Sequence, residues 1–211
     1  LAGDCNGKAA AVTSVVQTEK TEKAPALYDL TTLQREANAQ LGFTAKKTLA
    51  TAQKLYEQHK LLTYPRTDSR YISDDVVSTL PERLKSVMVD EYRDLARAIL
   101  MKRPLQTRFL VDNARVTDHH AILPSEEQPE LFRLSGPERN IYDLVVRRFL
   151  AVLLPPCEYE ETRLTLTVGG ETFTARGKIM KEPGWRAAYG LFLLEEDEED
   201  PEQALIRRLE E

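Results

Sequence analysis

The stretch that decides the fold is residues 31–57, TTLQREANAQLGFTAKKTLATAQKLYE. Thr31 and Gln34 have the spacing of a capping box, which predicts a helix that ends just before Gly42. A glycine supplies the positive φ that ends such a helix, and Thr44 can cap a second helix that continues to the end of the stretch. Two helices joined by so short a turn have the layout of a helix-turn-helix, and an ordinary helical hairpin gives the same pattern.

Further helices are expected after this pair. Ser73 can cap a helix that Pro81 interrupts or restarts, and another helix covers about residues 91–101. Ser135 and Glu138 form the clearest capping box of the chain, and the apolar stripe that follows them predicts a buried helix ending at a pair of prolines.

The two ends of this helical region have the pattern of strands. Residues 163–168 and 171–175 alternate around Gly169-Gly170, which predicts a β-hairpin with a two-residue turn. Valines near the N-terminus predict an extended segment. The sequence therefore indicates an α+β fold, mainly helical with flanking strands. We expect a β-segment in residues 1–24, a helical domain in 25–155, a β-hairpin in 156–190, and an acidic connector with the start of a helix in 191–211.

Composition limits the class of protein. A chain of 211 residues with 42% apolar residues can bury a core, and no apolar run reaches the roughly 18 residues that cross a bilayer. Cys5 and Cys157, the only cysteines, lie too far apart for a disulfide scaffold or a zinc finger, which favours a reducing, intracellular compartment. The first residue is Leu1 rather than Met, so we expect a piece of a longer protein.

The net charge of −5 does not exclude a nucleic-acid partner, because the acidic residues gather at one end. Residues 191–211 contain nine acidic and two basic residues, and subtracting them from the totals of 34 and 29 leaves 25 acidic against 27 basic residues. The rest of the chain can therefore carry a local basic surface.

Residues 61–70, LLTYPRTDSR, interrupt the helical pattern. Pro65 keeps Tyr64 out of the helical region and stiffens the chain, so a phenol and a guanidinium can be held close together. Arg66 and Arg70 offer planar forks suited to phosphate oxygens. Because nearby positive charge favours a phenolate and stabilises charge on phosphoryl oxygens, Tyr64 is a candidate nucleophile for a phosphodiester.

The other polar residues of this segment allow a second interpretation. Thr67 and Ser69 offer hydroxyls, and Asp68 can orient an arginine or cap the next helix. The alternative is a half-buried Tyr64 whose hydroxyl is bonded to Asp68, with the arginines on a solvated face.

Residues 117–124, TDHHAILP, contain two adjacent histidines. Neighbouring histidines rarely bind one metal, and no cysteine or third histidine lies close in sequence, so we exclude a zinc site. An imidazole of His119 or His120 is better suited to contact phosphate or transfer a proton. The alternative is a capping Asp118 followed by partly buried histidines.

Taken together, these segments resemble the type IA DNA topoisomerases, most closely the bacterial topoisomerase III branch. The resemblance rests on four blocks in the same order: LYDLTTLQR at residues 27–35, AKKTL at 45–49, LTYPRTDSRY at 62–71 and DHHAILP at 118–124.

The resemblance implies a role for each matching residue. Tyr64 corresponds to the nucleophile that cleaves one DNA strand and becomes linked to its 5′-phosphate without ATP. Arg66 corresponds to the arginine that contacts the scissile phosphate, and His119 to the histidine that assists cleavage by hydrogen bonding. His120 takes the place of a glutamate in the other branch. The matched blocks also suggest residues that contact nucleic acid: Lys46, Lys47, Thr67, Ser69, Arg70 and His120.

The resemblance further implies a winged-helix-like core for the helical domain and an arch domain for the strands. The expected partners are DNA, preferentially single-stranded, and the remaining domains of the parent enzyme, in the bacterial cytoplasm and without a membrane. In this family Mg²⁺ is bound by a toprim domain with an Asp-x-Asp-x-Glu motif, which is absent from this sequence. We therefore expect no metal in this chain, and no DNA relaxation by the chain alone.

Two other classes of protein share part of this pattern. A non-catalytic winged-helix module that binds single-stranded DNA explains the helix pair but not the Tyr-Pro-Arg string. A tyrosine recombinase also forms phosphotyrosine, but its catalytic Arg and His residues usually precede the tyrosine, whereas Tyr64 precedes His119.

Overall fold

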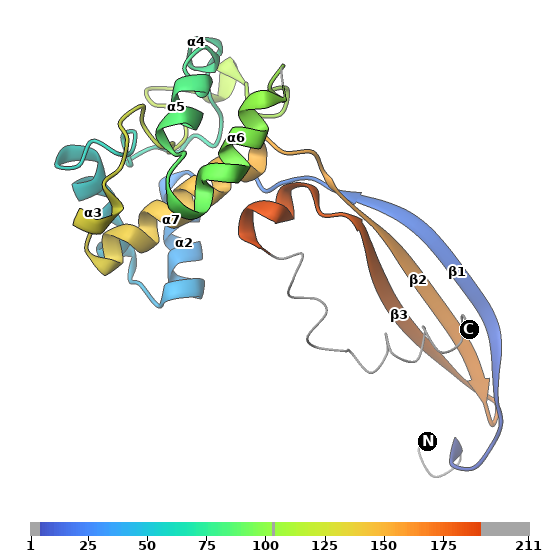
Figure 1. Ribbon diagram of the computed structural model, residues 1–211. Helices are drawn as coiled ribbons and strands as arrows, with labels where there is room; N and C mark the ends of the chain where they lie inside the picture. The colour runs from blue at the N-terminus through green and yellow to red at the C-terminus, as the bar shows by residue number, and fades with distance from the viewer. Residues whose placement is uncertain (1–4, 103, 191–211) are drawn as a thin grey trace. The chain divides into compact units, whose positions relative to one another are not determined.

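The structure is a computed structural model that describes residues 5–102 and 104–190. The chain divides into two compact units, a helical unit of residues 24–155 and a sheet unit of residues 1–23 and 156–211 (Figure 1). The predicted acidic connector at 191–211 lies outside the described residues. The α+β class predicted from the sequence is confirmed.

Six α-helices and three short 3₁₀ turns are described in the helical unit. The helices are α2 (Leu30–Leu41), α3 (Ala45–Glu57), α4 (Asp74–Val77), α5 (Leu80–Ser86), α6 (Arg93–Met101) and α7 (Gly136–Val152), and the 3₁₀ turns are η1 (Asp90–Tyr92), η2 (Asn113–Arg115) and η3 (Leu131–Arg133).

The longest helix, α7, is the centre of the helical unit (Figure 1). It contacts α2, α3 and α6. Ile141, Tyr142 and Phe149 are almost completely buried along it, as the apolar stripe predicts. The capping box of Ser135 and Glu138 is confirmed at its start.

The first helix begins one residue earlier than its expected cap. Asp29, not Thr31, is the N-cap of α2, and its carboxylate accepts a hydrogen bond of 2.6 Å from the Thr32 amide. The predicted capping box with Gln34 is therefore wrong. Aspartate is a stronger N-cap than threonine, and the Gln34 amide instead donates to the carbonyl of Ala45 at the start of α3.

The turn between α2 and α3 follows the prediction. Gly42 has a φ of 65° and its amide bonds back to α2. Thr44 caps α3 by accepting a hydrogen bond of 3.2 Å from the Lys47 amide. Because both signals act within four residues, they are readable from the sequence.

The predicted helix after Ser73 is two short helices, α4 and α5. Ser73 is the N-cap of α4 but makes no capping hydrogen bond with its side chain, and Pro81 lies in the first turn of α5. A proline lacks the amide that a helix interior needs, so α5 restarts at this point.

Outside the helices, the described part of the helical unit contains isolated β-bridges rather than strands. They join Tyr28 to Ile122, Leu62 to Pro124 and Ile72 to Val111. The winged-helix-like core stays a prediction. These bridges bring the Tyr64 segment beside the segment that carries the two histidines.

The sheet unit is a three-stranded antiparallel sheet in the order β1 (Ala10–Glu22), β2 (Cys157–Val168), β3 (Glu171–Glu182), followed by the 3₁₀ helix η4 (Gly184–Tyr189). The predicted hairpin is confirmed, and its strands are longer than expected. Gly169 and Gly170 have φ of 61° and 94°, as a two-residue turn with positive φ at both positions requires.

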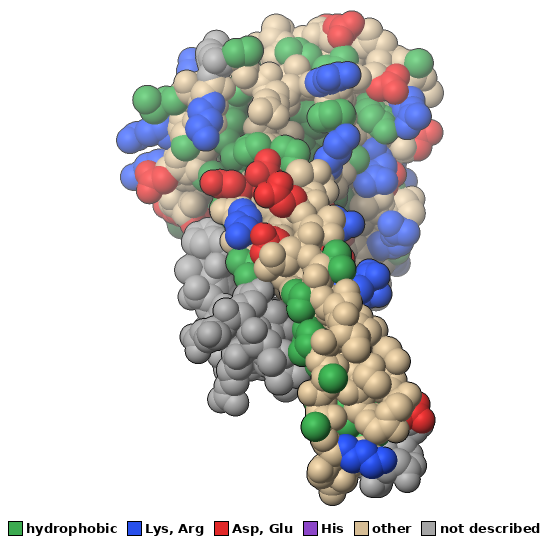
Figure 2. All heavy atoms as spheres, turned by 90° about the vertical axis from the view of Figure 1, so that its right-hand side faces the viewer, with side chains coloured by type: hydrophobic (Ala, Val, Ile, Leu, Met, Phe, Trp, Pro, Cys, Tyr) green, Lys and Arg blue, Asp and Glu red, His purple; other side chains and the backbone are tan. Residues whose placement is uncertain are grey.

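The sheet has little apolar burial of its own. Its buried cluster consists of Leu164 and Ala175 with Leu166 packed against them. Hydrophobic side chains are visible along the sheet (Figure 2), and five are exposed: Val12, Val15, Val16, Phe173 and Ile179. No described helix is both long enough and apolar enough to cross a membrane.

Candidate active site

The segment that carries Tyr64 is fixed by pairing with the segment after the histidines. The Thr63 amide donates to the Leu123 carbonyl at 2.9 Å, and the Thr63 hydroxyl accepts from the Leu123 amide at the same distance. That hydroxyl also donates to the carbonyl of Ala121 at 3.3 Å. The backbone that carries the Tyr64 side chain is therefore held in place by these hydrogen bonds.

Thr67 and Ser69 hold the same loop from inside. Both are buried, with 6% and 3% of their surface exposed. The Thr67 hydroxyl donates to the His119 carbonyl at 3.0 Å, and the Ser69 hydroxyl donates to the Arg115 carbonyl at 2.7 Å. We therefore propose that these hydroxyls position the loop and the histidine rather than contact nucleic acid.

Tyr64 is half-buried and contacts two other rings. Its ring centroid is 4.4 Å from that of His119, with the planes tilted by 43°. The Tyr56 ring of α3 also meets it edge to face, at 5.5 Å. Within the described residues the Tyr64 hydroxyl has no hydrogen bond, and the exposed Asp68 does not bond to it, so the alternative of a phenol bonded to Asp68 is wrong.

Arg66 is exposed and reaches toward α3, where its guanidinium donates to the side-chain oxygen of Gln53 at 3.2 Å. Gln53 and Tyr56 are three residues apart on α3 and so lie on one face of it. Arg66 and Tyr64 therefore contact the same face of one helix. Arg70 is half-buried, and its Nε donates to the Leu27 carbonyl at 3.3 Å, which ties the loop to the start of α2.

The two histidines differ in their surroundings. His119 is exposed, whereas His120 is half-buried with its Nδ1 2.7 Å from the Ala121 carbonyl. A carbonyl oxygen can only accept, so Nδ1 carries the proton. Burial lowers the pKa of His120, and the charge of nearby Arg83 lowers it further, which favours the neutral ring.

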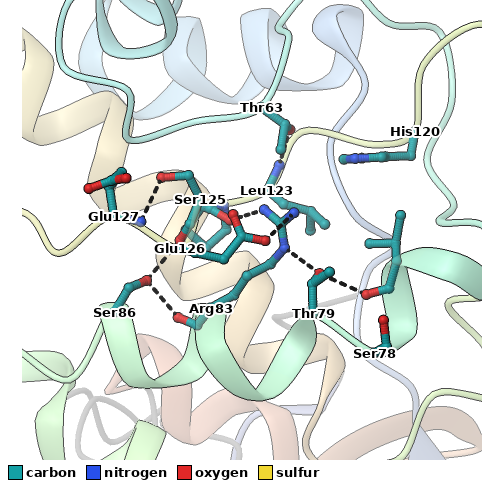
Figure 3. A network of polar contacts seen from close by, with 12 residues as sticks. Thr63, Ser78, Thr79, Arg83, Ser86, His120, Leu123, Ser125, Glu126 and Glu127 are labelled. Atoms are coloured by element: carbon teal, nitrogen blue, oxygen red, sulfur yellow. Dashed lines mark hydrogen bonds and ion pairs between the residues drawn. The ribbon is translucent and has the colours of Figure 1, made fainter.

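A buried arginine holds the segment that follows the histidines (Figure 3). Arg83 of α5, 6% exposed, donates to the Pro124 carbonyl at 2.6 Å and to the Thr79 hydroxyl at 2.8 Å, and it pairs with Glu126 at 2.8 Å. The Ser86 hydroxyl donates to the Ser125 carbonyl at 2.8 Å. Burial lowers the pKa of Arg83, but an arginine remains charged.

Sequence reasoning missed the supporting residues of this site. Tyr56 fits an ordinary apolar position of its helix, and Gln53 and Arg83 carry no local signal. A glutamine on a helix reveals an arginine partner 13 residues away only after the chain has folded.

Comparisons with known proteins identify the family. A family model described as DNA topoisomerase matches residues 1–211. This chain belongs to the DNA topoisomerase family. The type IA, topoisomerase III assignment predicted from the four blocks is confirmed.

The matched relatives show what fraction of a DNA topoisomerase 3 corresponds to this chain. DNA topoisomerase 3 of Bacillus licheniformis is 50% identical over 205 residues, which are 97% of this chain and 28% of that protein. DNA topoisomerase 3 of Bacillus subtilis is 47% identical over 210 residues, 100% of this chain and 29% of that protein. The chain thus spans less than a third of the curated relatives that it matches.

A solved structure shares the fold. It is the full-length topoisomerase I of Thermotoga maritima, with a TM-score of 0.60 and 25% identity, covering 89% of this chain and 31% of that one.

The magnesium ion that the family uses does not fit the part of the chain described here. Across residues 5–102 and 104–190, no three His, Cys, Asp or Glu side chains are grouped so that they could hold a metal ion.

The two lysines of the second block lie apart from the other candidates. Lys46 and Lys47 are exposed in the first turn of α3, and the Lys47 ammonium lies 3.7 Å from the centroid of the Phe43 ring. Tyr56 is nine residues beyond Lys47 on the same helix, or about 14 Å at 1.5 Å per residue. Any contact of these lysines with nucleic acid would be remote from Tyr64.

Proposed function

We propose that this chain carries the strand-cleaving tyrosine of a type IA topoisomerase III. Tyr64 would open one strand of DNA and rejoin it through a phosphotyrosine link to the 5′-phosphate, without ATP. The observation that carries the proposal is the arrangement of the phenol, which is half-exposed, free of hydrogen bonds within the described residues, and in ring contact with His119.

The bond changes are balanced in each direction. The Tyr64 oxygen bonds to phosphorus as the phenolic proton leaves to solvent, the bond from phosphorus to O3′ breaks, and O3′ takes up a proton. Attack of that 3′-hydroxyl on the phosphotyrosine reverses each change. The energy of the broken bond is kept in the ester, so rejoining needs no cofactor.

The neighbouring side chains have separate tasks in this scheme. The guanidinium of Arg66 would bind the scissile phosphate and stabilise the charge that grows on its oxygens. His119, exposed beside the Tyr64 ring, would donate a hydrogen bond to the reacting strand. Thr63 and Thr67 would keep these groups in register, because they bond the two segments together.

We also propose that the chain does not relax DNA alone, since it spans less than a third of its relatives. Negatively supercoiled plasmid incubated with the chain and magnesium should keep its topology. Relaxation in this assay would show that the missing parts are dispensable.

The proposed nucleophile is tested in a chimera, with residues 1–211 replacing the matching segment of the Bacillus subtilis relative. With single-stranded DNA and magnesium, the chimera should form a covalent adduct that survives denaturation on a gel. Tyr64→Phe should abolish the adduct while leaving the affinity for single-stranded DNA within about twofold, because the ring remains.

The matched control is Tyr71→Phe. This substitution removes a phenolic hydroxyl from the same loop, one that accepts a hydrogen bond of 2.8 Å from Arg115. The control should keep the adduct. An adduct that persists in Tyr64→Phe would refute the assignment and leave a non-catalytic single-stranded DNA-binding module as the better description.

A further inference from the structure

The last turn of α3 supplies an aromatic ring to the proposed nucleophile. Tyr56 lies one residue before the end of this helix and is half-buried. Its ring meets the Tyr64 ring edge to face, with 5.5 Å between the centroids and 79° between the planes. Aromatic pairs favour this arrangement, and the contact stabilises them beyond the apolar area that it buries. A helix is thereby joined to the loop that carries Tyr64.

The backbone between the two tyrosines is bent so that their rings can meet. Lys60 has a φ of 58°, a left-handed conformation that residues with a side chain rarely adopt. The Lys60 carbonyl accepts a hydrogen bond of 2.5 Å from the Ser125 hydroxyl. The Leu61 amide donates to the Leu55 carbonyl at 2.8 Å, which holds the chain against the end of α3. Such a backbone conformation persists only where surrounding contacts enforce it, so the separation of the two rings is set by the fold.

The ring contacts matter because no polar contact orients the Tyr64 phenol. Its hydroxyl has no hydrogen bond within the described residues, and the same is true of the Tyr56 hydroxyl. A half-exposed side chain without a polar partner samples several rotamers unless its neighbours restrict it. Among the described residues, the aromatic neighbours that supply this restriction are the rings of His119 and Tyr56. Truncation of Tyr56 would therefore release the Tyr64 ring and leave its phenol chemically unchanged.

We propose that Tyr56 is a positioning residue that holds the Tyr64 phenol in the direction of attack, and that its ring rather than its hydroxyl does so. Strand cleavage needs the phenolic oxygen in line with the bond from phosphorus to O3′, and a displacement of about 1 Å can slow a reaction about a hundredfold. Positioning of this kind changes how often a bound strand is attacked, not how tightly it binds. The inference rests on the proposed function, because it needs Tyr64 to be the nucleophile.

The test uses the chimera described above with single-stranded DNA and magnesium, and it follows adduct formation over a range of DNA concentrations. In Tyr56→Leu, the maximal rate should fall at least about tenfold, and the DNA concentration that gives half of this rate should stay within about twofold. Leucine keeps an apolar side chain and a high helix propensity, so α3 should be retained. A residue that only supported the fold would not separate rate from affinity in this way.

Two further variants assign the effect to the ring beside Tyr64. Tyr56→Phe removes only the hydroxyl and should restore the rate to within about twofold of the wild type. Tyr189→Leu is the matched control, because Tyr189 is also half-buried and meets the Trp185 ring edge to face, at 5.9 Å, in the sheet unit. It removes the same kind of contact from the other unit of the chain and should leave the rate unchanged.

Tyr56→Met guards against a local packing defect of the leucine variant. Methionine is flexible and fills irregular spaces, so it should show the same separation of rate from affinity. Loss of DNA affinity in both truncations would overturn the inference, because Tyr56 would then support the fold or bind the strand rather than direct the phenol.

The remaining outcomes separate this inference from the function on which it rests. If Tyr56→Leu forms the adduct as fast as Tyr189→Leu, Tyr56 does not position the phenol, and the proposed function stands. If Tyr56→Phe is as slow as Tyr56→Leu, the hydroxyl acts instead of the ring, which also overturns the inference. A wild-type chimera that binds DNA but forms no adduct refutes the proposed function, and the positioning role falls with it.

Discussion

Among the described residues, one side chain bonds to Arg66 and sets its direction. Its guanidinium donates to Gln53 on α3 at 3.2 Å, and the side chain is otherwise exposed. A long flexible side chain in solvent loses rotamer freedom when it binds, so a partner that holds it beforehand helps binding. Gln53 is thus a positioning residue in the proposed mechanism.

We expect Gln53→Ala in the chimera to slow adduct formation about fivefold, which corresponds to about 1 kcal/mol for one hydrogen bond to a charged group near the surface. The rate of adduct formation and the melting temperature are the two measurements. The rate should change more than the melting temperature, because the hydrogen bond that is lost is the one to the exposed Arg66.

The matched control for Gln53→Ala is Gln40→Ala. Gln40 donates to Glu36 on the exposed surface of α2, so its loss removes the same side chain away from the site. Equal rates for the two variants would show that Gln53 does not act through Arg66.

His120 makes the stability of the chain depend on pH. Burial lowers its pKa in the folded state below the ordinary value of about 6.5, and the charge of Arg83 lowers it further while Asp75 opposes them. The His120 imidazole therefore binds a proton more readily in the unfolded chain than in the folded chain. The contribution of the neutral His120 ring to stability is present above about pH 6.5, and it is lost as the pH falls through the pKa of the folded state.

We expect urea unfolding to give a lower free energy at pH 5 than at pH 7.5, and His120→Gln to lose part of that difference. His119→Gln is the control, because His119 is exposed beside it. A pH dependence that is identical in wild type and His120→Gln would contradict the assignment.

Among the elements, α5 matters because it clamps the segment that follows the histidines. Arg83 makes a hydrogen bond to the Pro124 carbonyl and an ion pair with Glu126 (Figure 3). The Ser125 amide in turn donates to the Leu61 carbonyl at 2.9 Å. One helix thus determines where both loops of the site lie.

Arg83→Met keeps the length of the side chain but leaves a buried carbonyl and a carboxylate without their donor. We expect the free energy of unfolding to fall by about 2–3 kcal/mol. Hydrogen exchange at the Ser125 amide should become faster. Denaturant unfolding and exchange followed by NMR are the measurements.

Arg139→Met serves for comparison, because Arg139 forms a surface ion pair with Glu91 at 3.5 Å and both side chains are more than 40% exposed. Its loss should cost less than about 1 kcal/mol. If the two variants were equally stable, the clamp would have no energetic role.

At the scale of the whole chain, the two units differ in how much apolar surface they bury. The largest fully buried side chains, including Tyr28, Tyr142 and Phe149, all lie in the helical unit. The sheet unit has a small cluster of Leu164, Ala175 and Leu166, and Cys157, Trp185 and Ala188 are its other buried apolar residues among those described. Three strands with so small a core are marginal without further cover.

We expect a polypeptide of residues 24–155 to unfold cooperatively on heating. Before heating, it should give a near-UV circular dichroism signal, which reports fixed packing of its aromatic side chains. The helical unit contains its own core, so removal of the sheet should leave it folded. A polypeptide of residues 156–190, which contains only the β2–β3 hairpin of the sheet, should show no cooperative transition. A non-cooperative melt of 24–155 would mean that the core depends on the sheet.

The sequence determined the features that arise within a few residues. The Thr44 cap, the Ser135–Glu138 capping box and the Gly169-Gly170 turn are local, and each is found in the structure where it was predicted. The four ordered blocks also determined the family, because a string such as TYPRTDS is rarely matched by chance.

Tertiary structure alone decided which residues meet. The contact of Tyr64 with His119, the hydrogen bond of Arg66 to Gln53 and the clamp of Arg83 on Pro124 join positions 55, 13 and 41 residues apart. Such contacts depend on how the helices pack around α7, and no local pattern encodes them.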